Sequence, residues 1–127
     1  MFYLYVGVFS ALGGMSRYAI SLILPATTFP IATLTVNLLG CFLLAIVNQM
    51  LAENEKIPAA LIAGMGTGFV GAFTTFSSFS VDNIRLLTAG HYGIAISYMV
   101  ISMVGGLLMV QLGYKVAAKY RTRRRAV

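Results

Sequence analysis

The stretch GAFTTFSSFS, residues 71–80, places a cluster of polar side chains inside an otherwise apolar chain. Five hydroxyl groups fall within seven residues: Thr74, Thr75, Ser77, Ser78 and Ser80. Neutral hydroxyls and carbonyls can replace the hydration shell of an ion without holding it tightly, which suits a passive pore. Serine, threonine and glycine also weaken a helix, so we expect the regular structure to be interrupted here.

Two phenylalanines lie within this stretch at a spacing of three, so Phe76 and Phe79 share one face of a helix. The edge of an aromatic ring is positive, and two such edges could face a small anion in a narrow, dry pore. Packing against protein or lipid is the more usual role for such a pair. The spacing alone favours packing over anion contact.

Other polar residues lie in the middle of apolar segments. Asn37 stands in TLTVNLLGCF, where a buried amide needs a partner. It could join two helices by hydrogen bonds, or its amide could donate to an anion, and both interpretations stay open. Tyr98 and Ser102 are four residues apart and could form a hydroxyl track or bond to a neighbouring helix.

Several kinds of chemistry are not indicated. No glutamate lies within an expected span, and the nearest carboxylate, Asp82, is expected to pair with Arg85 three residues later. A phosphate-binding loop, a nucleophile beside a base and a metal-ligand set are all missing from the sequence, so we predict no enzyme. Two alternatives to a passive pore are a small proton-coupled multidrug transporter, which would need a glutamate in the first span, and a non-transporting membrane assembly subunit.

The elements that must position these residues are membrane spans. The chain is 59% hydrophobic and 9% charged, whereas soluble domains carry about 25% charged residues. Four segments are long enough to cross a bilayer, at about residues 2–24, 31–51, 58–87 and 92–118, in one domain covering residues 1–127. The third segment is expected to be broken between Gly71 and Phe79. Gly64, Gly68 and Gly71 share a helix face, and the first two suggest close packing.

The charges indicate an orientation and partners. The net charge is +6, and much of it lies in the basic tail at about residues 119–127, which favours lipid headgroups over nucleic acid. The positive-inside rule therefore favours both termini in the cytoplasm, although the charges before the tail are balanced. Cys41, the single cysteine, is expected to be a packing residue. Four spans make a thin bundle, so a homodimer or a larger assembly is expected.

Three stretches, GGMSRY (13–18), NLLGCFLL (37–44) and GAFTTFSSFS (71–80), resemble the signature motifs of the Fluc (CrcB) fluoride channels. The resemblance covers essentially the whole chain. It implies an all-α integral membrane protein that forms an antiparallel, dual-topology homodimer with two fluoride pores. It also implies passive export of cytoplasmic fluoride across the bacterial cytoplasmic membrane.

The resemblance also assigns roles to individual residues. It implies that Asn37, Phe76 and Phe79 contact fluoride, with Ser77 and Ser78 as further pore hydroxyls and with Tyr98 and Ser102 at the start of a polar track on the fourth span. It implies a structural sodium ion held by the main-chain carbonyls of Gly71 and Thr74. The track is not continued at Gly106 and Val110. The basic tail, which favours one orientation, fits poorly with an antiparallel dimer.

Overall fold

A computed structural model describes residues 1–51 and 56–125 of the chain, and its regular elements are all helices. The first two are α1 (Phe2–Ile23) and α2 (Ile31–Met50), and the last is α6 (Tyr92–Arg125). Between them lie α3 (Ala59–Ala63), the π-helix η1 (Gly64–Val70), α4 (Gly71–Phe73) and α5 (Phe76–Thr88). Four helices in the described part, counting Ala59–Thr88 as one, are long and apolar enough to span a membrane. The predicted four spans and the bend in the third are therefore confirmed.

The connections between spans are set by proline and glycine. Pro30 and Pro58 stand at the N-caps of α2 and α3, where the missing amide proton of proline costs nothing. Gly90 has a φ of +78° directly after α5. His91 N–H donates to the carbonyl of Leu86 at 2.8 Å and Gly90 N–H donates to Leu87 at 3.1 Å, which is the hydrogen-bond pattern of a Schellman motif. This motif turns the chain sharply into α6.

The third span packs on α1 through glycines. A Cβ on Gly64 would lie 2.9 Å from the ring of Phe9, and one on Gly68 would lie 2.9 Å from the carbonyl oxygen of Val6. The predicted packing role of these two glycines is therefore confirmed. Gly71, by contrast, is exposed and leaves that face. The π-helix between them takes more residues per turn than an α-helix, so the expected common face is lost.

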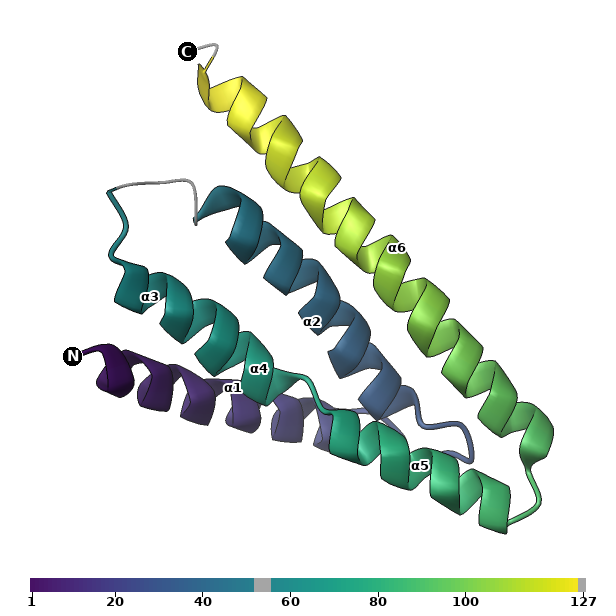
Figure 1. Cartoon of the computed structure of the whole chain (residues 1–127). Helices are drawn as coiled ribbons and strands as arrows, with labels where there is room; N and C mark the ends of the chain where they lie inside the picture. Colours follow the sequence, from purple (N-terminus) through teal and green to yellow (C-terminus); the bar gives the residue numbers. More distant parts are fainter. Residues whose placement is uncertain (52–55, 126–127) are drawn as a thin grey trace.

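The fourth span packs along α2 through a second set of small residues. Gly105 packs on Leu38, and Gly113 packs on Ala45 and the backbone of Phe42. Figure 1 shows α6 alongside α2, and the third span alongside α1. Because the contact positions rise together along both helices, α2 and α6 run parallel.

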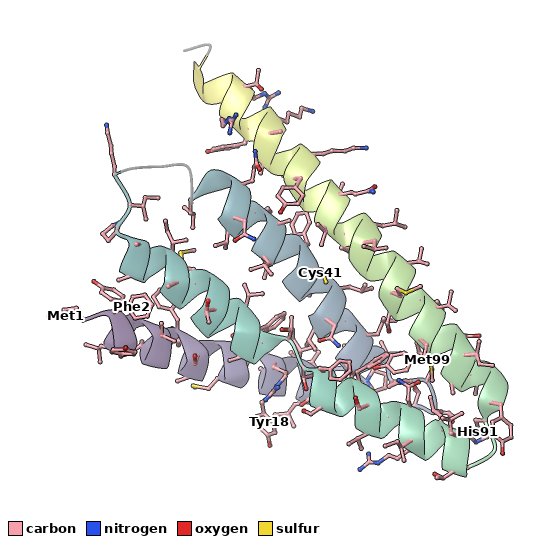
Figure 2. All side chains as sticks on the ribbon, in the orientation of Figure 1. Met1, Phe2, Tyr18, Cys41, His91 and Met99 are labelled. Atoms are coloured by element: carbon pink, nitrogen blue, oxygen red, sulfur yellow. The ribbon has the colours of Figure 1, made fainter. Side chains whose placement is uncertain are left out.

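Cys41 lies in this α2–α6 interface. It is half-buried, and its sulfur lies 3.5 Å from the position of a Cβ on Gly106. Figure 2 shows its side chain pointing from α2 toward α6. The expectation that this cysteine is a packing residue is confirmed.

The most tightly packed cluster lies where α5, α6 and the loop before α2 meet. Leu86, Ala95 and Tyr98 are buried there, with Phe29 and Phe79 packed against them. Elsewhere most large apolar side chains point outward, as expected of helices that face lipid or another membrane chain. The cluster holds α5 on α6.

Candidate functional site

The third span is interrupted by two extended residues. α4 ends at Phe73, and Thr74 (ψ 159°) and Thr75 (φ −151°, ψ 115°) leave the helical region before α5 begins at Phe76. Asn37 on α2 binds the exposed backbone at this point. Thr75 N–H donates to Asn37 Oδ1 at 2.8 Å, and Asn37 Nδ2 donates to the Thr75 carbonyl at 3.1 Å. The asparagine thus satisfies both backbone groups of the residue at the centre of the break.

Of the two interpretations of Asn37, the helix-joining one is therefore observed. Contact of Asn37 with an anion is still compatible with this arrangement, because a side-chain NH₂ carries two N–H donors. One of them is used on Thr75, and no described residue accepts the second. That second N–H is available to an anion.

The break frees main-chain carbonyls, among them those of Gly71 and Thr74. In a continuous helix the Gly71 carbonyl accepts from the amide of Thr75, but this amide donates to Asn37 instead. The Thr74 carbonyl would accept from Ser78, whose amide donates to Thr75 Oγ1 at 3.1 Å. Both residues line the larger cavity described below. The two carbonyls predicted to bind sodium are therefore among the four, of residues 71–74, that this backbone leaves without a helical partner.

Hydroxyls gather at the start of α5. Thr75 caps this helix, and its Oγ1 lies 3.2 Å from the hydroxyl of Ser77 and donates to that of Ser78 at 3.1 Å. The other two hydroxyls of the stretch return to the helix backbone, because Thr74 donates to Val70 and Ser80 donates to Phe76. The polar cluster therefore consists of Thr75, Ser77 and Ser78 at the positive end of the α5 dipole.

From the sequence, Thr75 is one of the hydroxyls of the stretch with no individual assignment to the site, yet it stands at the centre of the site. It is buried, caps α5 and holds both hydrogen bonds to Asn37. Its signal was the preference for threonine at an N-cap, immediately before a helix with apolar residues at a spacing of three.

The two phenylalanines lie beside each other at the break but differ in packing. Their ring centroids are 5.9 Å apart with the planes inclined by 33°. Phe79 is packed, with its centroid 5.1 Å from that of Tyr98, whereas Phe76 is 79% exposed. One ring is therefore fixed by the fold, and the other projects from the surface of the single chain.

A cavity of about 850 Å³ lies between α2, the third span and α6. Six of the predicted site residues line it: Asn37, Gly71, Thr74, Phe76, Phe79 and Ser102. Three do not: Ser77, which is exposed, Tyr98, which is fully buried, and Ser78. Ser78 lines a second cavity of about 230 Å³ together with Arg17, Ser21, Thr33 and Thr75. Thr75 borders both cavities, so the break separates them.

Tyr98 and Ser102, the fourth-span residues of the predicted polar track, have buried hydroxyl groups. Neither hydroxyl makes a well-formed hydrogen bond within the described residues, although Thr33 and Asp82 lie near that of Tyr98. Such groups are costly at membrane depth unless a ligand or a partner chain supplies the missing contact. Gly106 is packed on Cys41 and offers no hydroxyl, so α6 does not continue the track past Ser102.

The expected ion pair between Asp82 and Arg85 was wrong. Thr33 Oγ1 donates to Asp82 Oδ2 at 2.7 Å instead, and no ion pair joins the two charges in the part of the chain that the structure describes. The carboxylate turns toward α2, and it lies close enough to act electrostatically on Tyr98. A tertiary partner has replaced the local one.

Comparison with known proteins decides the family. A family model described as "CrcB-like protein, Camphor Resistance (CrcB)" matches residues 4–114. The chain belongs to the CrcB family. A CrcB relative from Listeria innocua, named "Fluoride-specific ion channel FluC 2", is 55% identical over 123 residues, which are 97% of this chain and 95% of the relative. One from Bacillus cereus, named "Fluoride-specific ion channel FluC 1", is 46% identical over 117 residues, 90% of this chain and 85% of the relative.

The CrcB relatives carry the names of ion channels and not of enzymes, so the prediction that the chain is no enzyme is confirmed. The resemblance found in the three motifs is also confirmed, since the matched residues include all of them. Within this CrcB chain, two of the motifs meet in space, because Asn37 begins the second and Thr75 lies within the third.

Proposed function

We propose that this protein is a passive, fluoride-selective channel that exports cytoplasmic fluoride across the bacterial cytoplasmic membrane. The names of the relatives support the ion, and the break at Thr74 and Thr75, bridged by Asn37, supports the mechanism. No carboxylate or lysine lines the larger cavity among the described residues, so its polar groups are neutral. Neutral groups let an ion enter and leave without a proton or an energy source.

The polar groups at the break suit an anion. The first amides of α5 point out of its N-terminus, and the Thr75 hydroxyl caps only that of Ser78. The second N–H of Asn37 and the hydroxyl of Ser77 lie in the same region and can also donate. The ring edges of Phe76 and Phe79 complete a set in which the positive ends of dipoles face the ion. A small anion that loses water here gains several weak donors.

The smaller cavity is where we place the approach of the ion. Arg17 lines it with hydroxyls from three helices, those of Ser21, Thr33 and Ser78. A cation among neutral hydroxyls attracts anions in general and does not select among them. Selection then falls to the narrow region beyond Thr75, between this cavity and the phenylalanines.

A second copy of the chain completes the site in this proposal. Phe76 is 79% exposed, and the freed carbonyls of Gly71 and Thr74 lie at the margin of an open cavity. Polar backbone at membrane depth persists only where protein or water covers it. An antiparallel homodimer with two pores, as the family resemblance implies, would place one broken span against the other.

Sodium is proposed as a structural ion of this dimer. Main-chain carbonyls are ligands that hard cations accept, and the freed carbonyls of Gly71 and Thr74 in each chain would give four ligands when two copies meet. A bound cation would satisfy these oxygens and hold the two broken spans together. In this proposal it does not take part in conduction.

Fluoride efflux from liposomes that hold the purified protein tests the proposal. We expect rapid fluoride efflux and chloride efflux lower by at least about a hundredfold, because the larger chloride ion fits a narrow site poorly and gains less from contact with small dipoles. Phe76→Ile and Phe79→Ile keep apolar bulk but remove the ring edges, and each should slow fluoride efflux by about tenfold or more. Phe2→Ile is a matched control, because Phe2 is half-exposed to the membrane and lies far from the break along the chain.

Three outcomes would contradict the proposal. If chloride passed as readily as fluoride, the channel would not be selective for fluoride. Uptake of a lipophilic cation driven by a proton gradient would favour the multidrug transporter. A chain that assembles but conducts neither ion would favour the assembly subunit.

Removal of sodium gives an independent test with a readout other than conduction. Replacing sodium with a large organic cation should lower the thermal stability of the assembled protein, because the freed carbonyls lose their ligand. The expected loss is about 2–3 kcal/mol when sodium is present at about a hundred times its dissociation constant. Thermal unfolding followed by circular dichroism measures it, with an exchange of the anion at constant ionic strength as the control. Identical unfolding curves would exclude a stabilising sodium ion.

A further inference from the structure

The end of α6 continues beyond the helix against which it packs. Gly105 packs on Leu38 and Gly113 packs on Ala45, so the parallel α2 and α6 keep the same register along their contact. Equal rise in both helices puts the end of α2 level with about residue 118 of α6. α6 then continues for about seven residues, or ~10 Å, and Figure 1 shows its yellow end extending past α2.

Three cations lie on one face of the last part of α6. Lys115, Lys119 and Arg123 are four residues apart, and all three are exposed. Gly113 and Ala117 are buried, and a residue two positions later points about 200° away around the helix. The three cations, called here the basic stripe, therefore point away from the bundle. Figure 2 shows nitrogen-bearing side chains gathered at this end of α6.

The register of α6 on α2 puts the basic stripe near the expected membrane interface. The described part of the α2 span runs to Gln49, which is level with about residue 117 of α6. The uncharged run of α6 ends at Tyr114, directly before Lys115. Lys115 then lies at the edge of the hydrocarbon, and Lys119 and Arg123 lie within ~10 Å beyond it, while the headgroup layer is about 5–8 Å thick. The exposed Tyr114 and Tyr120 lie on the same part of α6, as aromatic residues at the membrane interface do.

The charges of the stripe are suited to anionic headgroups. The sequence of α6 contains no Asp or Glu, so no acidic side chain of this helix neutralises them. We propose that the basic stripe binds the phosphates of anionic lipids such as phosphatidylglycerol. Lipid phosphates are already at this depth, whereas a nucleic acid would have to enter the headgroup layer to reach Lys115. This site is separate from the proposed pore and does not depend on what the pore conducts.

Spin-labelled lipids test the proposal on the full chain in phosphatidylcholine bilayers. The fraction of motionally restricted label gives the affinity of labelled phosphatidylglycerol relative to labelled phosphatidylcholine. We expect a preference of about fivefold or more for phosphatidylglycerol at low salt, since one basic residue near the surface contributes about that factor. The preference should fall in 1 M salt, where the Debye length is about 3 Å.

Matched variants separate charge from folding. The triple variant K115Q/K119Q/R123Q should lose the preference while its helical circular dichroism is unchanged, and K115R/K119R/R123K should keep it. An equal affinity for both lipids in the original chain, or a preference that survives in the glutamine variant, would overturn the proposal. Displacement of the labelled lipid by an RNA oligonucleotide would instead assign the stripe to nucleic acid, and displacement by millimolar inorganic phosphate would assign it to the free anion.

Discussion

Replacing Asn37 with alanine should abolish fluoride efflux, with a loss of at least about a hundredfold, and should also destabilise the protein. The side chain holds both the N–H and the carbonyl of Thr75 at the centre of the break. Without it two buried backbone groups lose their partners, at a cost of about 1–3 kcal/mol each. The chain can then either close the break into a continuous helix or lose the packing of α2 on the third span, and both remove the proposed site.

Two measurements on the same variants check this expectation. Fluoride efflux from liposomes reports the pore, and thermal unfolding followed by circular dichroism reports the fold. Asn48→Ala is a matched control for stability, because Asn48 lies on the same helix and lines the same cavity but is exposed. An Asn37→Ala variant that unfolds at the original temperature and conducts at the original rate would show that Asn37 neither supports the break nor contacts the ion.

Replacing Gly13 with alanine should give the largest loss of stability among single methyl additions on α1. A Cβ at this position would overlap the carbonyl oxygen of Phe69 on the third span. The obstacle is backbone, so a side-chain rotation cannot relieve it and the helices must move apart. Overpacking of this kind costs about 1–3 kcal/mol and occasionally more. We expect the unfolding temperature in detergent to fall by about 5–10 °C.

The neighbouring glycine provides the control. A Cβ on Gly14 would meet nothing within 4 Å, and alanine is a better helix former than glycine by about 1 kcal/mol. Gly14→Ala should therefore be neutral or slightly stabilising. If both variants melted alike, the close approach of α1 to Phe69 would not be a feature of the folded protein.

The spans could be predicted closely from sequence because apolar length is a local property. The expected start of the second span at residue 31 and of the fourth at residue 92 agree with the helices, and the first span ends within one residue of the expected position. The fourth helix alone is clearly longer than expected, ending at Arg125 and not near residue 118. Lysine and arginine are good helix formers and favour a helix C-terminus, so the helix continued where the apolar pattern ended.

The break was also predictable, but its construction was not. Hydroxyls and glycines in one stretch indicate a weak helix, and this held at Thr74 and Thr75. The sequence could not show that Asn37 would bind Thr75, which is 38 residues away. The ion pair of Asp82 with Arg85 was wrongly predicted for the same reason. The i, i+3 rule considers only neighbours along the chain, whereas the observed partner, Thr33, lies 49 residues away.

The sequence by itself determined the class of protein, the four spans, the weak point in the third and, through three motifs, the family. These follow from composition, apolar length and local propensity, which need no knowledge of how helices pack. Only the tertiary structure decided that Gly13 is packed and Gly14 is open, that Asn37 spans the break, and that Thr75 separates two cavities. Such contacts depend on the register between packed helices, which is set by many side chains at once and cannot be read from any one segment.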